Sequence, residues 1–234
     1  MIVVGIDTAT PQTSVAIGDG SKTIASTSLA TGKPSHDLVT VLLQEQLERT
    51  GIDLGTMAGI AVGIGPGLFT GLRVGVETAK TLAQVLSIPI VGLPSLDVLA
   101  FGYRYSRRPV AAVIDARRGE VFSALYMPVP GGLNRVSDYL VGPPDHLVAE
   151  LEAFGQEVLL VGNGAILYRR DLEVLGAQAE VASAGSGFPE ASALVELAIP
   201  RFVREEHDRL YDVAPMYLRK SDAEIAWGSR ARSG

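Results

Sequence analysis

Short apolar runs separated by glycine and polar turns fill the beginning of the chain. Residues 2–6 read Ile-Val-Val-Gly-Ile and end at Asp7, and residues 13–18 and 22–29 alternate like returning strands. This pattern predicts an antiparallel meander of three strands with Asp7 at its first bend. Helical periods then predict helices over 34–50 and 70–86, with a strand over 58–63 between them.

The second half of the chain opens as the first does. Residues 110–114 form another apolar run, which ends at Asp115, and residues 121–126 return after a turn. The other periods predict a strand over 88–92, a helix over 96–105 capped by Ser95, a helix over 145–154, a strand over 158–161 and helices over 165–172 and 190–202.

Two halves with the same opening indicate an internal duplication. We expect a first lobe over 1–106, a second lobe over 107–228 and a disordered tail over 229–234. Strand hairpins followed by helices, given twice, are typical of the actin-like fold of sugar kinases and heat-shock ATPases, in which two ribonuclease H-like lobes face each other. The sequence therefore predicts an α/β protein with two mixed sheets flanked by helices.

Composition narrows the class of protein. The 234 residues are 47% hydrophobic, which is enough for a packed core, and the net charge of −6 opposes nucleic-acid binding by the isolated chain. With no cysteine, disulfides and thiolate metal sites are excluded. Neither a secretion signal nor a long apolar run is visible, so we expect a cytosolic protein without a membrane role.

The segment 63–75 holds five glycines and one proline between a predicted strand and a predicted helix. Glycine inside a helix costs about 0.5–1 kcal/mol relative to alanine, so Gly71 and Gly75 need a compensating reason. Gly71, Gly75, Ala79 and Ala83 are spaced four apart, which places small residues along one helical face. This stripe is explained either by close approach of another helix or by a backbone cradle for an anion.

The first aspartate turn is a candidate nucleotide site in such a fold. Asp7 and Thr8 offer a carboxylate and a hydroxyl that could hold a magnesium ion through water. The alternative is that Asp7 only accepts N–H groups of its own turn.

The second aspartate turn, 115–120, starts at Asp115 and contains one glycine, whereas a phosphate cradle usually needs several. Arg117 and Arg118 could compensate, or could pair with Glu120. Residues 161–165, which include Gly162 and Gly164, resemble a weakened adenosine loop but also an ordinary junction between a strand and a helix. Weak binding of ATP or ADP with magnesium therefore stays open.

The sequence lacks the motifs for metal binding, for a serine nucleophile and for dinucleotide binding. His36 has no second histidine one helical turn later, because that position is Thr40, so no metal site is predicted. The motif Gly-x-Ser-x-Gly is absent, and Pro66 and Phe69 interrupt any dinucleotide fingerprint.

The helix over 34–50 is apolar on two neighbouring faces. Leu38, Val41 and Leu42 mark one face, and Val39 and Leu43 mark the other. Because one sheet covers only one face, this helix either packs internally against the helix over 70–86 or forms a protein interface.

Residues 65–75, Gly-Pro-Gly-Leu-Phe-Thr-Gly-Leu-Arg-Val-Gly, resemble the signature Gly-Pro-Gly-x-Phe-Thr-Gly-x-Arg-x-Gly of the TsaB family, also called YeaZ. Its signature-loop residues are Gly65, Pro66, Gly67, Phe69, Thr70 and Arg73. Further matches are Gly5-Ile6-Asp7-Thr8-Ala9-Thr10, Gly92-Leu93-Pro94-Ser95-Leu96-Asp97, Asp115-Ala116-Arg117-Arg118-Gly119-Glu120 and Pro215-Met216-Tyr217-Leu218-Arg219.

The resemblance implies a non-catalytic partner of TsaD in making N6-threonylcarbamoyladenosine beside the anticodon of tRNA. TsaD carries a metal-binding His-x-x-x-His where this chain has His36 and Thr40. By the resemblance, the first two long helices pair with those of TsaD as a four-helix bundle, and the ATPase TsaE docks across that junction. The tRNA is reached through the complex, a lone chain can form a homodimer with the same surface, and no cofactor is certain.

From the helical pattern and the resemblance together we expect a partner interface, and Arg73 should fix the loop or a partner carboxylate. The interface residues are His36, Val39, Leu43, Gly71, Leu72, Gly75, Val76 and Ala79. Gly75→Leu should then abolish pairing and leave the monomer folded. The rival functions are a small ATP-dependent kinase with Asp7 as metal ligand, and a peptidase acting on TsaD, for which the sequence offers no nucleophile–base pair.

Overall fold

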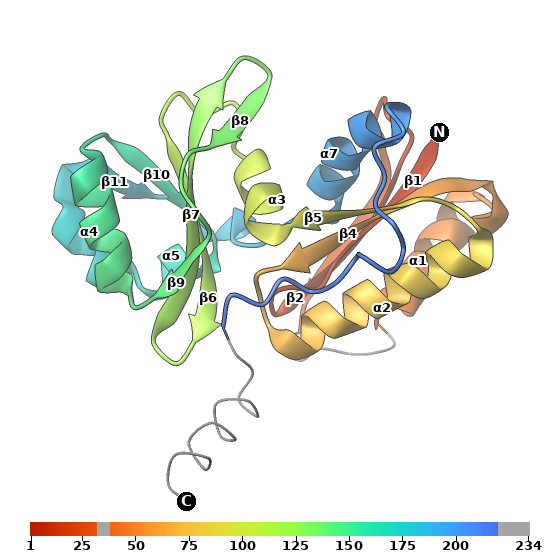
Figure 1. Ribbon diagram of the computed structural model, residues 1–234, viewed down its shortest axis with the longest axis horizontal. Coiled ribbons are helices and arrows are strands. Elements are labelled where there is room, and N and C mark those ends of the chain that lie inside the picture. Colours follow the sequence, from red (N-terminus) through yellow and green to blue (C-terminus); the bar gives the residue numbers. More distant parts are fainter. Residues whose placement is uncertain (32–37, 220–234) are drawn as a thin grey trace, which may run out of the picture.

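The computed structural model describes residues 1–31 and 38–219, which form two lobes side by side (Figure 1). The first lobe contains a five-stranded sheet in the order β3-β2-β1-β4-β5. Its strands are β1 (Ile2–Asp7), β2 (Gln12–Gly18), β3 (Thr23–Ala30), β4 (Met57–Gly65) and β5 (Ile90–Pro94). Its helices are α1 (Leu38–Thr50), the 3-10 turn η1 (Leu54–Thr56), α2 (Phe69–Leu86) and α3 (Ser95–Phe101).

The second lobe contains a six-stranded sheet whose main path is β11-β10-β6-β7-β8, and β9 also pairs with β7. Its strands are β6 (Val110–Arg117), β7 (Glu120–Val129), β8 (Gly132–Arg135), β9 (Leu140–Gly142), β10 (Val158–Val161) and β11 (Ala179–Val181). Between them lie α4 (Pro144–Phe154), α5 (Asn163–Leu167), α6 (Arg169–Leu172), η2 (Glu173–Gln178) and η3 (Ala184–Ser186), and α7 (Ala191–Val203) comes last.

The duplication predicted from the sequence is present in the topology. In each lobe an antiparallel meander, β1-β2-β3 or β6-β7-β8, is extended by two parallel strands beside its first strand. The predicted bend after β1 is confirmed, because Asp7 pairs with Ser14 in the antiparallel register of β1 and β2. Sequence periodicity missed the short strands β8, β9 and β11.

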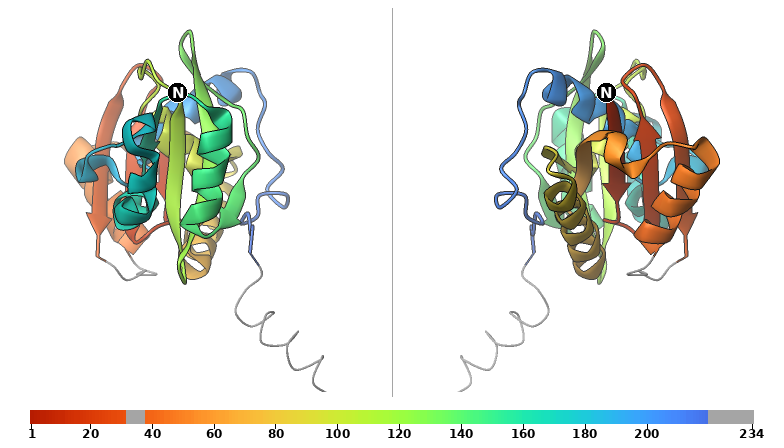
Figure 2. Two further views of the ribbon diagram at one scale, coloured as in Figure 1. Left: turned by 90° about the vertical axis from the view of Figure 1, so that its left-hand side faces the viewer. Right: turned by 90° about the vertical axis from the view of Figure 1, so that its right-hand side faces the viewer.

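Both faces of the first sheet are covered by helices. Alternate residues of β1 separate the two layers: Val4 and Ile6 pack with α1 and α2, whereas Val3 packs with α7. Figure 2 shows α1 and α2 together on one side of this sheet. The sheet therefore buries the inner faces of both long helices and leaves their outer faces uncovered.

The predicted lobe boundaries need one correction. The α7 helix packs on β1 and β2, so the chain returns to the first lobe after it has completed the second sheet. The first lobe consists of residues 1–101 together with α7 and most of the described segment after it. Sequence order alone assigned this last part to the second lobe, because nothing local in a helix states which sheet it covers.

The remaining predictions concern single elements. Ser95 is not a helix cap, because it is the first residue of α3, Pro94 takes the capping position, and the Ser95 hydroxyl is used elsewhere. His36 and the tail 229–234 lie outside the described residues. In the described part of the chain no helix has the length and apolar character needed to cross a membrane.

Candidate functional site

The glycines of α2 leave space for the turn that follows β1, which packs directly against them. A Cβ atom added to Gly71 would lie 2.1 Å from the Thr8 carbonyl oxygen, and one added to Gly75 would lie 2.2 Å from Thr8 Oγ1. The Thr8 hydroxyl donates a hydrogen bond of 2.7 Å to the Gly71 carbonyl. The glycines of the small-residue stripe therefore pack against the chain's own first turn, and Ala79 and Ala83 lie in the core between the helix and the sheet.

The loop before α2 also packs closely against this turn. A Cβ atom on Gly63 would lie 1.9 Å from Asp7 Oδ2, and one on Gly67 would lie 2.2 Å from the Ala9 carbonyl oxygen. That carbonyl accepts a hydrogen bond of 2.7 Å from the Leu68 N–H group. We call residues 7–9 the Asp7 turn, and residues 63–75 enclose it because their glycines have no side chains in the way.

The Asp7 carboxylate is enclosed, with only 1% of the residue exposed. Its Oδ1 accepts from the Ala9 N–H group at 3.0 Å, and its Oδ2 accepts from the Ser95 hydroxyl at 2.9 Å. Ser95 Oγ in turn accepts from the Gly65 N–H group at 3.2 Å. These bonds connect β1, the signature loop and the start of α3.

Burial raises the pKa of Asp7 to about 7, and the nearby charge of Glu190 acts in the same direction. The hydrogen bonds from Ala9 and Ser95 oppose this shift but do not outweigh burial. A magnesium ligand should be ionised and reachable. The Asp7 carboxyl group is neither reachable nor strongly acidic, so the second interpretation, an aspartate that organises its own turn, fits the geometry.

Glu190 ties α7 to the same region. Its carboxylate accepts from the Ser28 hydroxyl at 2.5 Å, from Ser14 at 3.3 Å and from Gln12 Nε2 at 3.1 Å. The Ala191 N–H group donates to Ser14 Oγ at 2.8 Å, which satisfies one of the free donors at the start of α7. This network is a structural junction of β2, β3 and α7.

The residues predicted as a partner interface are buried in the chain's own core, and that prediction is wrong at residue level. They are Val39, Leu43, Gly71, Leu72, Gly75, Val76 and Ala79. The sheet and the Asp7 turn cover this arc, so an apolar face did not require a partner. The expectation that Gly75→Leu would spare the monomer also fails, since even a Cβ atom meets Thr8 there.

Three side chains of the signature loop point to the surface. Phe69 and Thr70 are exposed at the start of α2, and Arg73 is exposed one turn later. The Arg73 guanidinium lies 4.2 Å from the centre of the Phe69 ring, and its Nε donates to the Tyr217 hydroxyl at 3.3 Å. Arg73 thus fixes the chain's own C-terminal segment, a contact that the sequence pattern did not indicate.

The second aspartate turn is organised differently. Asp115 Oδ1 accepts from the Arg117 N–H group at 2.9 Å and from the Tyr168 hydroxyl at 3.3 Å. Arg117, Arg118 and Gly119 all have positive φ angles, of 64°, 56° and 79°. Two arginines in the left-handed region leave no room for the tight glycine cradle that a phosphate needs. Glu120 pairs with Arg219 at 2.8 Å, and Arg117 lies 3.5 Å from the Asp115 carboxylate.

Gly162 and Gly164 are required by packing against β6. A Cβ atom on Gly162 would lie 2.1 Å from the Val113 carbonyl oxygen, and one on Gly164 would lie 2.9 Å from the Ile114 carbonyl carbon. The Asp115 N–H group donates to Asn163 Oδ1 at 3.3 Å. The structure therefore brings Asp115 beside Gly162 and Gly164, while Asp7 and Thr8 lie in the first lobe.

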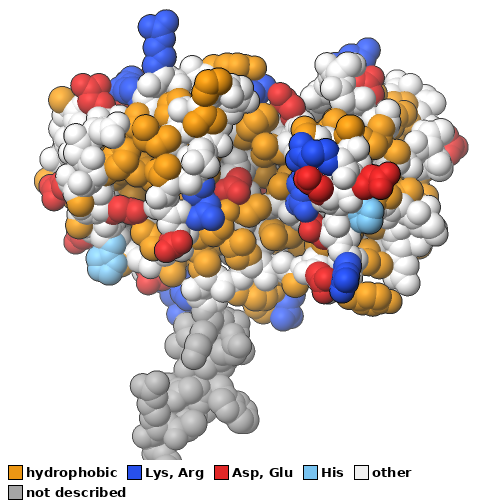
Figure 3. Space-filling model, turned by 45° about the horizontal axis from the view of Figure 1, so that its top comes forward, with side chains coloured by type: hydrophobic (Ala, Val, Ile, Leu, Met, Phe, Trp, Pro, Cys, Tyr) orange, Lys and Arg blue, Asp and Glu red, His pale blue; other side chains and the backbone are white. Residues whose placement is uncertain are grey.

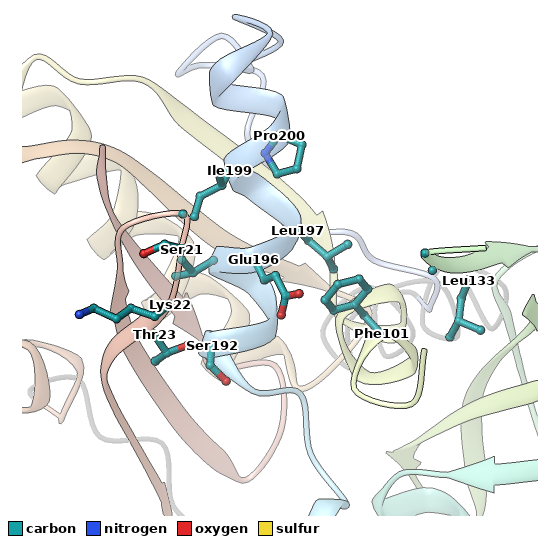
Figure 4. A pocket seen from close by; sticks show the side chains of 14 residues that line it. Ser21, Lys22, Thr23, Phe101, Leu133, Ser192, Glu196, Leu197, Ile199 and Pro200 are labelled. Atoms are coloured by element: carbon teal, nitrogen blue, oxygen red, sulfur yellow. The ribbon is translucent and has the colours of Figure 1, made fainter. Parts of the chain in front are cut away.

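Two of the cavities lie beside α3 and α7, and neither is lined by Asp7, Thr8 or Asp115. The larger, about 670 Å³, is formed by the β2–β3 turn, α7, the end of α3 and the β7–β8 turn. Figure 4 shows Phe101 and Leu197 close together on its wall and the Lys22 side chain extending away from it. Glu196 on the wall is already paired with Arg104 at 2.9 Å, and the other polar lining residues are Ser21, Lys22, Thr23 and Ser192.

Figure 3 shows hydrophobic side chains along the junction of the lobes, with acidic and basic side chains scattered around them. Within residues 1–31 and 38–219, no group of histidine, aspartate or glutamate side chains is arranged to hold a metal ion.

The comparisons with known proteins identify the class of protein first. The duplicated strand order is that of the actin-like fold with two ribonuclease H-like lobes, as the sequence predicts. The model of a family described as "TsaD: tRNA N6-adenosine threonylcarbamoyltransferase" matches residues 31–227. The chain is thus an actin-like protein related to the threonylcarbamoyltransferases.

Similarity to individual proteins then identifies the family within this class. The tRNA threonylcarbamoyladenosine biosynthesis protein TsaB of Bacillus subtilis (strain 168) is 34% identical over 154 residues, 65% of each chain, just under two thirds. TsaB of Escherichia coli (strain K12) is 28% identical over 240 residues, 97% of each chain. The structure of YeaZ from Pseudomonas aeruginosa matches with a TM-score of 0.80 and 26% identity, covering 93% of this chain and 99% of that one. The chain belongs to the TsaB family of tRNA threonylcarbamoyladenosine biosynthesis proteins, which confirms the prediction from the signature.

Proposed function

We propose that this chain is a catalytically silent subunit required for transfer of the threonylcarbamoyl group to the adenosine beside the anticodon of tRNA. It acts by forming a heterodimer with TsaD and by helping to recruit TsaE at the shared junction. The observation that carries this proposal is the closed Asp7 turn. Both carboxylate oxygens of Asp7 accept internal hydrogen bonds, and glycines 63, 67, 71 and 75 close around the turn.

A phosphate-transfer centre of this fold needs a reachable, ionised carboxylate to hold magnesium. Burial opposes ionisation of Asp7, and the turn around it has no space for a phosphate. Chemistry is therefore left to the paralogue, and this chain contributes binding energy.

The proposed docking surface is the outer face of the two long helices, defined here as Val41, Gln44 and Glu48 of α1 with Thr81 and Val85 of α2. Val41 is 55% exposed and Val85 is 74% exposed, although both are apolar. The two helices cover the same side of one sheet, so their outer stripes form one platform (Figure 2). A pair of helices from a related chain laid on it would complete a four-helix bundle.

The test uses two matched valine variants. Val85→Glu places a charge on the docking surface, and Val203→Glu, at an α7 residue that is 70% exposed, places the same charge elsewhere. We expect Val85→Glu to weaken co-elution with TsaD at least about tenfold, because a buried unpaired charge costs several kcal/mol. Val203→Glu should co-elute like the wild type, and both should melt like the wild type.

The same variants also test the recruitment of TsaE and the formation of a homodimer. TsaE should join the wild-type and Val203→Glu complexes and fail to join Val85→Glu, and any homodimer of the lone chain should dissociate in Val85→Glu. If Val85→Glu binds TsaD as tightly as Val203→Glu does, the docking surface is wrong. Saturable binding of ADP with magnesium by the isolated chain, lost in Asp7→Asn, would instead favour the nucleotide-binding alternative.

A further inference from the structure

The segment after α7 runs from one lobe to the other. We call residues 208–219 the strap. In Figure 1 its blue trace descends from the first lobe, passes across the molecule and ends beside β6 of the second lobe. No regular helix or strand is assigned within it, so its position depends on individual contacts.

The first part of the strap is fixed to the first lobe. The Asp208 N–H group donates to the Ile90 carbonyl at 2.9 Å, and Asp208 Oδ2 accepts from the Gly92 N–H group at 2.8 Å, which covers the edge strand β5. Val213 is buried in the core beneath α1 and α2. Its carbonyl accepts from Lys80 Nζ at 3.2 Å.

The middle of the strap lies on the signature loop. The Met216 N–H group donates to the Ile64 carbonyl at 2.7 Å, just before the glycine-rich turn. The Tyr217 ring stacks on Phe69 with ring centres 4.9 Å apart. Arg73 completes the cluster, with its guanidinium over the Phe69 ring and its Nε bonded to the Tyr217 hydroxyl.

The end of the strap contacts the second lobe. Leu218 packs against the hydrophobic cluster that α3 forms with β6 and β7. Arg219 Nη1 donates to Glu120 Oε2 at 2.8 Å, and Glu120 is the first residue of β7. Two adjacent residues of the strap therefore contact the second lobe directly after Tyr217 has bonded to α2.

We propose that the strap is a tether that fixes the second lobe relative to α2, and that Phe69 and Arg73 are the positioning residues that hold it. The helix α3 is the main packed contact between the lobes, and a single short helix leaves rotation about it poorly resisted. A second attachment away from that axis restricts the rotation. The signature then has two internal roles, since its glycines seat the Asp7 turn and its two large side chains hold the strap.

The relative position of the two lobes can be measured with one spin label on each lobe. Because it contains no cysteine, Gln84→Cys on α2 and Glu152→Cys on α4, both exposed, give one spin label on each lobe. Pulsed electron paramagnetic resonance then yields the distribution of distances between the labels. The measurement uses the isolated chain, so it does not depend on binding to TsaD and can fail independently of the proposed function.

Tyr217→Ala should broaden the distance distribution. It should also speed amide hydrogen exchange of residues 214 and 216–219 about tenfold, which corresponds to about 1.4 kcal/mol, because the stacked pair with Phe69 is lost. Tyr217→Phe keeps the ring and should restore the narrow distribution. Tyr211→Ala is the matched control, because Tyr211 lies on the same strap, is 87% exposed and has no hydrogen bond or ring contact with any described residue.

A second variant, Arg219→Ala, tests the tether even if Tyr217→Ala does not fold. Arg219→Ala removes only the ion pair to Glu120, which is partly exposed, and should broaden the distribution less than Tyr217→Ala does. The tether is overturned if the distribution and the exchange rates of Tyr217→Ala equal those of Tyr211→Ala. It is overturned equally if Tyr217→Ala does not fold and Arg219→Ala leaves the distribution unchanged.

Discussion

Asp7 shows how a residue type can remain while its role differs from that expected of the fold. In this chain its carboxylate accepts from Ala9 and Ser95 and joins β1 to the start of α3. Sequence reasoning found the residue and its place at the end of β1, because an apolar run that ends in a carboxylate is visible locally. It could not find Ser95 as the partner, since 88 residues separate the two.

The raised pKa of Asp7 predicts a pH dependence of stability with a definite sign. The pKa is 3.8 for an ordinary aspartate and about 7 in the folded chain, so between these values the folded state holds a proton that the unfolded state has lost. The contribution of Asp7 is therefore fully favourable below the lower value and is lost as the pH rises through about 7. Above that pH the free energy of unfolding is reduced by a few kcal/mol, because each pH unit between the two pKa values costs about 1.4 kcal/mol.

Asp7→Asn removes the titration and keeps the shape of the side chain. Urea unfolding at about pH 5 and about pH 8 should show the variant gaining stability relative to the wild type as the pH rises. An equal difference between the two proteins at both pH values would contradict the raised pKa of Asp7.

At the scale of the element, α2 has two different faces. Its glycine and alanine stripe is buried against the sheet and the Asp7 turn, whereas Arg73, Glu77, Thr81 and Val85 are exposed. Residue spacing predicted the stripe correctly and assigned it to the wrong neighbour. A run of small residues permits close approach by any backbone, and the sequence does not state whether that backbone belongs to a helix or to a turn.

The seat for Thr8 can be tested at Gly75. Alanine favours a helix by about 1 kcal/mol over glycine, so an open site would gain stability. We expect Gly75→Ala to lose about 1–3 kcal/mol in urea unfolding, because its Cβ atom overlaps Thr8 Oγ1. Thr81→Ala on the exposed face should change stability by less than about 0.5 kcal/mol.

A double-mutant cycle identifies the atom responsible. Thr8→Ala removes Oγ1, so the loss in Gly75→Ala combined with Thr8→Ala should be smaller than the sum of the single losses. Additive losses would mean that Gly75 is required for another reason.

For the whole molecule, the two lobes and the strap produce a folded actin-like body without an accessible first aspartate. The prediction at this scale is that tRNA modification requires this chain in addition to its partner proteins. Threonylcarbamoyladenosine should form on tRNA when this chain, TsaD and TsaE are combined with a threonylcarbamoyl donor, and should not form when this chain is left out. ATP hydrolysis by the isolated chain with magnesium should stay at the background rate.

The control for this reconstitution is Val203→Glu, which should support modification like the wild type, whereas Val85→Glu should reduce it in proportion to lost binding. Steady turnover of ATP or tRNA by the isolated chain would contradict a silent subunit.

The sequence by itself determined the longer strands, the long helices, the duplication and the family, because periodicity, aspartate-ended strands and an eleven-residue signature are local properties of the chain. Only the tertiary structure decided which part of the chain packs against each face of a helix or sheet. It placed α7 on the first sheet, filled the glycine stripe with the Asp7 turn and paired Phe69 and Arg73 with Tyr217. Periodicity records that a face is covered, but the covering group is set by contacts between residues that are far apart in sequence.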